Sequence, residues 1–131
     1  MKRKKNDKRT SQTSTKRKIS EMIWEFAGDF ICLGETQEHK QSHLNAACSA
    51  WNIACNPHDK RKGLLDRYMT EHRRFNPHAD SADSAAVRSD MEKLIAKKLT
   101  MFPMDLRQIV GARLVPMGDK DHIEVVSATV G

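Results

Sequence analysis

Hydrophobic residues recur at intervals of three and four positions along four segments of the chain, which is the spacing of one face of an α-helix. The segments that show this spacing are about residues 21–33, 36–56, 57–75 and 83–101. Residues suited to helix ends flank them: Ser20, Thr36 and Asn56 are predicted N-caps, Pro57 suits a first helical position, and Gly34 ends the first segment. We therefore predict four amphipathic helices.

The last part of the chain changes period. Residues 108–116 and 122–129 are rich in β-branched side chains, and residues 117–121 between them are typical of a turn. This pattern predicts a β-hairpin over about residues 108–129. Because a two-stranded ribbon is only marginally stable by itself, the hairpin should pack on the helices or meet a strand of another molecule. A homodimer through the hairpin is one predicted arrangement.

Together these elements predict an α+β fold that is predominantly α: a compact four-helix domain with a C-terminal β-hairpin, residues 19–131. A section of this length buries enough surface for one hydrophobic core. No run of 18 apolar residues occurs, so no membrane span is expected, and the N-terminus lacks the apolar core of a signal peptide. We expect a cytoplasmic protein, or a nuclear one if the source is a eukaryote.

Positive charge is concentrated in residues 1–18. That segment has one acid, Asp7, and nine of the chain's 23 lysines and arginines: Lys2, Arg3, Lys4, Lys5, Lys8, Arg9, Lys16, Arg17 and Lys18. Its net charge is +8, whereas residues 19–131 hold 14 basic and 16 acidic residues and have a net charge of −2. Because its remaining residues are mostly polar and cannot form a core, we predict that the segment is a disordered basic arm.

A basic arm of this kind is suited to bind nucleic acid, or the ribosome, through phosphate groups and without reading sequence. It contains no aromatic residue that could stack on unpaired bases. Three alternatives to nucleic-acid binding stay open. Lys4 and Lys5, followed by residues 16–18, have the spacing of a two-part nuclear import signal. A basic extension can also serve solubility alone or contact a membrane surface.

Uncharged polar side chains form a ridge on the second predicted helix. Asn45, Ser49, Asn52 and Asn56 follow one another at steps of four, three and four, within residues 41–58, which hold no formally charged side chain. A helix covered on two faces would keep such a composition, so we expect it to be central. Buried amides need partners: the ridge should bond the backbone of a neighbouring element or a ligand, and Asn45 and Asn52 should be shielded.

The same pattern predicts the surroundings of other side chains. Trp51 should be buried against the helix of residues 21–33. Phe75 should complete the apolar face of the helix of residues 57–75. Lys98 falls on an apolar face near a helix end, so its stem should lie along that face while its ammonium group reaches water.

Residues that could perform chemistry are few and scattered. His39 and His43 lie one helical turn apart and could share a metal, but they are weak candidates because a zinc site needs a third and a fourth ligand. Cys55 and His58 flank a helix end without the third group of a nucleophilic site. The odd set of three cysteines, of which Cys32 is the first, is typical of reduced, buried thiols. We therefore expect no metal, no cofactor and no catalysis.

The sequence thus favours a small non-enzymatic binding protein, whose basic arm contacts nucleic acid or the ribosome while the helical body binds a more specific partner. The alternative is a protein–protein interaction or regulatory adaptor in which the arm is incidental. Such an adaptor would use the edge of the hairpin or an acidic stripe on the first helix, formed by Glu21, Glu25 and Asp29 at steps of four.

Overall fold

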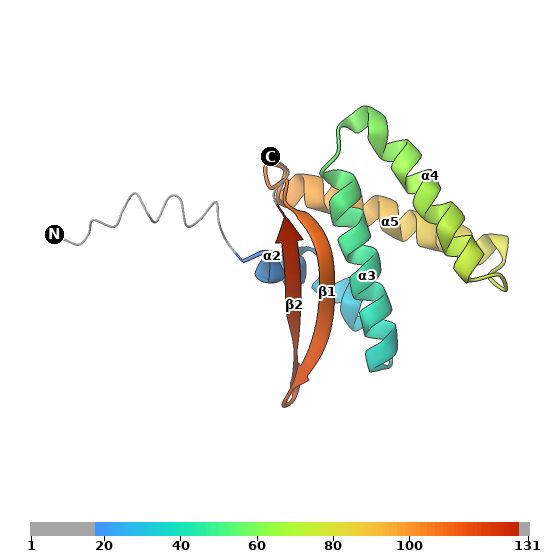
Figure 1. The fold of residues 1–131 in the computed structure, drawn as a ribbon. Coiled ribbons are helices and arrows are strands. Elements are labelled where there is room, and N and C mark those ends of the chain that lie inside the picture. The colour runs from blue at the N-terminus through green and yellow to red at the C-terminus, as the bar shows by residue number, and fades with distance from the viewer. Residues whose placement is uncertain (1–17, 129–131) are drawn as a thin grey trace.

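The computed structural model describes residues 18–128, which form four helices followed by a two-stranded antiparallel hairpin (Figure 1). The elements are α2 (Ile19–Cys32), α3 (Gln37–Ala54), α4 (His58–Phe75), α5 (Ser81–Met101), β1 (Gln108–Met117) and β2 (Lys120–Ala128). The predicted fold class is therefore confirmed. The predicted basic arm lies outside the described residues, apart from Lys18, which immediately precedes α2.

Helix α3 is the central element, because it contacts α2, α4, α5 and β1. Figure 1 shows the hairpin on one side of α3 and α4 on the other. Leu44, Ala47, Ala50 and Trp51 of α3 are completely buried. The Trp51 ring meets the ring of Phe26 in α2 edge to face, with 5.7 Å between the centroids. The predicted burial of Trp51 against the first helix is confirmed.

Two of the helices begin with side-chain caps. The Thr36 hydroxyl accepts a hydrogen bond from the backbone N–H of His39 at 3.1 Å, as predicted for the start of α3. At the start of α5, Asp80 accepts from the backbone N–H of Asp83, and the Asp83 carboxylate accepts from that of Asp80. This reciprocal pair is a capping box, and it satisfies two backbone donors that the helix itself leaves unpaired.

Two predicted caps are wrong. Helix α2 already begins at Ile19, which is buried in the core, so Ser20 lies inside the helix. Pro57, rather than Asn56, is the N-cap of α4. The Asn56 side chain instead donates from Nδ2 to the carbonyl of Asn52 at 2.8 Å, in the last turn of α3.

Gly34 allows a close approach between the connection after α2 and the first turn of α3. A Cβ atom at this position would lie 2.6 Å from the backbone nitrogen of Lys40. Real Cβ atoms essentially never come so close to another heavy atom, so the site requires glycine. Gly34, which was predicted to end the first helix, therefore also allows α3 to begin close to the end of α2.

The hairpin turns through a two-residue loop of Gly118 and Asp119, in which Gly118 has a positive φ of 67°. Met117 and Lys120 pair directly beside it. Primed turns of this length match the twist of the two strands, which explains why glycine stands there. The turn is shorter than the predicted residues 117–121, and the register shifts by a bulge between Ile109 and Gly111.

Helix α4 is less covered than its sequence predicts. Its buried residues are Leu65 and Met69. Phe75, on the last turn beyond Met69, is 76% exposed, so its predicted place in the apolar face is wrong. The periodicity is correct, but the buried residues of α4 lie in its middle and its last turn is mostly exposed.

Candidate functional site

One face of α3 binds the backbone of β1 through side-chain amides. Nδ2 of Asn52 donates to the carbonyl of Ile109 at 2.9 Å, and Oδ1 accepts from its N–H at 2.7 Å. Gln41 repeats the pattern three helical turns earlier: its Nε2 donates to the Ala112 carbonyl at 3.1 Å, and its Oε1 accepts from the Leu114 N–H at 2.8 Å. These bonds, which we call the α3–β1 seam, satisfy backbone groups that a neighbouring strand would otherwise pair.

The seam confirms the prediction for Asn52, whose partner is backbone rather than ligand. Asn56 is also structural: besides its bond to Asn52, its own carbonyl accepts from Nε of Arg61 at 2.9 Å. The sequence analysis missed Gln41. The available signal was its position eleven residues before Asn52, at the start of the same uncharged stretch.

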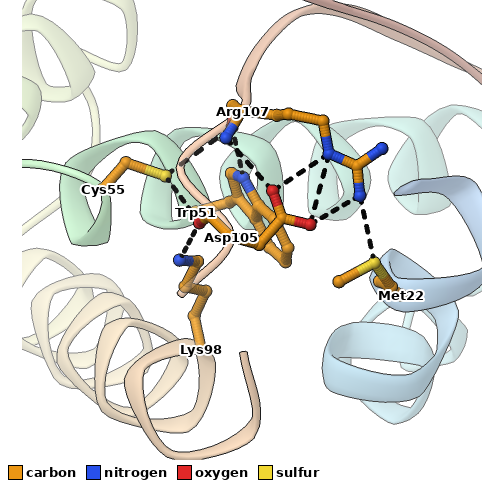
Figure 2. Close-up of polar contacts among 6 residues, drawn as sticks. All are labelled: Met22, Trp51, Cys55, Lys98, Asp105 and Arg107. Atoms are coloured by element: carbon orange, nitrogen blue, oxygen red, sulfur yellow. Dashed lines mark hydrogen bonds and ion pairs between the residues drawn. The ribbon is translucent and has the colours of Figure 1, made fainter. Parts of the chain in front are cut away.

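A second set of polar contacts joins α3 to the connection between α5 and β1, and we call it the Asp105 junction (Figure 2). Nε1 of Trp51 donates to the Arg107 carbonyl at 2.7 Å, and Nζ of Lys98 donates to the Asp105 carbonyl at 2.5 Å. The Cys55 thiol lies 3.6 Å from both carbonyls. The Arg107 guanidinium folds back on the Asp105 carboxylate, with Nη2 and Oδ2 2.5 Å apart.

Lys98 is completely buried in this junction, so the prediction that its ammonium reaches water is wrong. The connection folds over the end of α5 and supplies the carbonyl of Asp105, while the Trp51 ring lies 4.8 Å from Nζ. Burial lowers the pKa of Lys98, against the opposing effects of Cys55 and Asp105. Burial also raises the pKa of Cys55, which favours the unreactive thiol.

The Asp105 carboxylate, although partly buried, stays charged because the hydrogen bonds from Arg107 lower its pKa. Burial acts to raise its pKa, but the hydrogen bonds from Arg107 outweigh this effect and hold the pKa below the ordinary value. Those same bonds raise the pKa of Arg107. Each polar group of the junction thus bonds a neighbour within the fold. This arrangement fixes the connection before β1 and suits a structural role.

The other face of α3 borders a cavity of about 480 Å³, which we call the α3 cavity. From α3 it is lined by Ser42, His43, Asn45, Ala46 and Ser49. Helix α4 contributes Tyr68 and His72, with Asn76 beyond its end, and α2 and α5 complete the wall. A volume of this size lies within the range of small-molecule sites.

His43 has a fixed orientation at the cavity wall. Its ring stacks on the Phe30 ring with 4.6 Å between centroids, and its Nδ1 lies 2.7 Å from the Phe30 carbonyl oxygen. Because a carbonyl can only accept, Nδ1 carries the proton, and Nε2 of the neutral ring is a hydrogen-bond acceptor.

His39, the other histidine of the predicted metal pair, is exposed. Within residues 18–128, no group of three His, Cys, Asp or Glu side chains is placed to hold a metal ion.

The predicted ridge therefore divides between two environments. Asn52 and Asn56 bond backbone, whereas Asn45 and Ser49 line the α3 cavity. Asn45 is exposed, and its Oδ1 accepts from Nε2 of Gln41 on the same helix at 2.9 Å. The prediction that Asn45 is shielded is wrong, because its face of α3 borders the cavity rather than another element.

His72 carries an unusual polar atom at this cavity. Its Nδ1 is shielded from water and, among the residues that the structure describes, has no hydrogen-bond partner. The ring lies beside that of Tyr68, with 6.3 Å between the centroids. Buried polar atoms are nearly always paired, so the Nδ1 atom of His72 is an exception among the described residues. The helical spacing of α4 alone gives no sign of this unpaired atom.

The three cysteines are free thiols. Cys48 is buried, and burial raises its pKa to about 12. Cys32 is exposed, which contradicts the prediction that the thiols are buried. It follows Ile31 by one residue and so points about a quarter turn away from the buried face of α2.

Neither models of known protein families, nor curated protein sequences, nor solved structures match this chain. None of the helices within residues 18–128 combines the length and the apolar character that crossing a membrane requires.

Proposed function

We propose that this chain is a small non-enzymatic binding protein of the cytoplasm, or of the nucleus in a eukaryote. Residues 1–18 contact nucleic acid or the ribosome through phosphate groups, while the body binds a more specific partner, for which the α3 cavity is the candidate site. The separation of charge supports this proposal: residues 1–18 have a net charge of +8, and residues 19–131 have a net charge of −2. With a net negative body, general attraction to a polyanion depends on the arm.

The arm is tested in the full-length chain by replacing its nine lysines and arginines with glutamine. Fluorescence anisotropy then measures binding to short labelled duplexes and single strands between about 50 and 200 mM salt. We expect the wild-type affinity to fall steeply with salt, by a logarithmic slope of about 0.9 for each duplex phosphate neutralised. The glutamine variant should lose most of both the affinity and the slope.

A matched control keeps the composition of the arm and scrambles the order of its residues. Because phosphate contacts carry no sequence information, the scrambled arm should bind as well as the original. Unchanged affinity and salt dependence in the glutamine variant would show that the arm has no such role.

A second candidate function, a protein–protein adaptor, is favoured by the apolar surface of the hairpin. Val110, Met117 and Val126 are 69%, 60% and 64% exposed. Among the described residues, β2 pairs with β1 along one edge only, whereas α3 occupies the outer edge of β1. A second copy of the chain is the simplest partner for such an edge.

Light scattering coupled to size exclusion distinguishes the two candidates. A dimer that the substitution Val126→Lys dissociates, and that persists after nuclease treatment, would favour the adaptor. A monomer that binds nucleic acid through its arm would favour the first proposal.

A further inference from the structure

Several groups in the wall of the α3 cavity are hydrogen-bond acceptors, beside the hydroxyl groups of Ser42, Ser49 and Tyr68, which can also donate. Nε2 of His43 accepts, because Nδ1 of the same ring donates to the Phe30 carbonyl. Nδ2 of Asn76 donates to the His72 carbonyl at 2.8 Å, which leaves its Oδ1 as an acceptor. The carboxylate of Asp90, also in the wall, can only accept when it is charged. A ligand that pairs with these groups must therefore bring several N–H or O–H donors.

The formal charge of the cavity wall also favours a ligand that brings donors. Among the described residues that line the cavity, Asp90 is the one with a formal charge. Nδ1 of His72 has no partner within the described fold, and in the tautomer that protonates Nε2 it is a further acceptor. The Asp90 carboxylate would repel an anionic ligand and attract a cationic one.

Apolar and aromatic side chains form a large part of the wall, beside the polar side chains of Ser42, Asn45 and Ser49. Phe30 and Leu33 of the α2 end, and Val87 and Met91 of α5, line it together with the ring of Tyr68. Such a surface takes an apolar ring, and an aromatic face also attracts a cation. Fixed polar groups set against an apolar wall are the usual composition of a small-molecule site.

We propose, building on the binding function proposed for the body, that the α3 cavity binds a small molecule with an apolar ring and a cationic amine- or amidine-type head group. The ring lies against Phe30 and Tyr68, and the N–H groups of the head bond the acceptors of His43, Asn76 and Asp90.

Three probes that share one ring test this ligand class in the full-length chain. Benzamidine carries a cationic donor head, benzamide a neutral head with donors, and benzoate an anionic head with acceptors only. Backbone amide shifts in ¹H–¹⁵N spectra, recorded near pH 8, where histidine is ordinarily neutral, report which residues each probe contacts. We expect benzamidine to shift the residues around Asn45 and His72, with a Kd at least about tenfold lower than that of benzoate.

Asp90→Asn should weaken benzamidine by about threefold to fivefold and affect benzamide less, because it removes the charge but keeps one acceptor oxygen. Asp90 is exposed, so this variant should fold. Glu92→Gln is the matched control: it removes the same charge from the same helix, but Glu92 lies outside the wall of the cavity and should leave both probes unaffected.

The outcomes separate the ligand class from the binding function. If benzoate binds the cavity as tightly as benzamidine, the proposed class is wrong, but the cavity remains a binding site. If none of the probes shifts the residues of the wall, both the ligand class and the cavity's part in the proposed function are refuted. The part assigned to the arm is decided separately by its own salt titration.

Discussion

Replacing Asn52 with alanine should remove the strongest fixed point of the α3–β1 seam. The substitution deletes two hydrogen bonds to Ile109 and leaves its N–H and its carbonyl unpaired. Ile109 is 6% exposed, so water reaches these groups poorly. An unsatisfied buried polar group costs about 1 to 3 kcal/mol, and two such groups with partial access to water should cost about 2 to 4 kcal/mol in all. This is a large share of the stability of a small domain.

Urea unfolding followed by tryptophan fluorescence measures this loss, and Asn45→Ala is the matched control. Asn45 lies on the same helix but is exposed and bonds only within α3. Both substitutions gain the same helix propensity, so the difference between them reports the two bonds of Asn52 to Ile109 rather than a change in the helix itself. We expect Asn45→Ala to change stability by no more than about 0.5 kcal/mol. If the two variants differ by less than that amount, the seam does not hold the hairpin.

Asn52→Asp adds a pH test of the same geometry. The introduced carboxylate, when charged, can still accept from the Ile109 N–H but faces the Ile109 carbonyl without a proton to donate. A protonated carboxyl regains that donor, so bonding to the neutral form should raise the folded-state pKa of the introduced carboxyl group. Its stabilising contribution is then present below the unfolded pKa of about 3.9 and is lost as pH rises through the folded value. The free energy of unfolding of Asn52→Asp should therefore rise relative to that of Asn52→Ala as pH falls. A difference between the two variants that does not change with pH would contradict the two-bond arrangement.

Four further substitutions test other parts of the fold by the same unfolding measurement. Trp51→Ala should cost about 3 to 5 kcal/mol, since the ring is completely buried and its indole N–H bonds a backbone carbonyl; an unchanged midpoint would show that α3 is not central. Gly34→Ala should cost about 1 to 3 kcal/mol because its Cβ would meet the backbone of Lys40, whereas at Gly63 nothing lies within 4 Å of an added Cβ and alanine should stabilise α4. Burial raises the pKa of Cys48 from 9.0 to about 12, so between these values the unfolded state releases a proton that the folded state keeps, and stability falls as pH rises. At about pH 10 this loss is about 1.4 kcal/mol; Cys48→Ala should abolish it, and an identical alkaline slope in both proteins would contradict the assigned burial.

The fold was predictable where a local pattern and the tertiary structure agree. The uncharged residues 41–58 indicate a helix covered on two faces, and α3 is the central helix. Helical periodicity separates the four helices, and β-branched composition with a glycine turn marks the hairpin. In each case the pattern lies within the residues of the helix or hairpin itself, so a single sequence is sufficient to predict the element.

The prediction was wrong where the outcome depends on what a distant segment does. Asn45 and Asn52 have the same side chain on the same helix, but only Asn52 lies opposite a strand. Lys98 is buried because a backbone carbonyl seven residues later folds over it, and a carbonyl leaves no mark in the sequence. Phe75 fits the helical period but lies beyond the part of α4 that its neighbours cover.

The candidate site was predictable only in part. The predicted ridge included Asn45 and Ser49, which line the α3 cavity. The acceptor groups used in the proposal for the cavity come from other residues. The state of His43 follows from a contact with the Phe30 carbonyl, and that of His72 from the lack of a partner within the described fold. Both depend on how the helices pack rather than on residue type.

The α3–β1 seam also sets an order of events during synthesis. Asn52 and Ile109 are 57 residues apart, and Trp51 and Arg107 are 56 apart. At roughly 5 to 20 residues per second, a ribosome needs about 3 to 11 s to make the intervening chain. During that interval α3 can form and pack on α2, but its amides and indole have no strand to bond. The helix at the centre of the finished domain thus spends its first seconds with one side open, and this is the surface that a chaperone or a neighbouring nascent chain would meet.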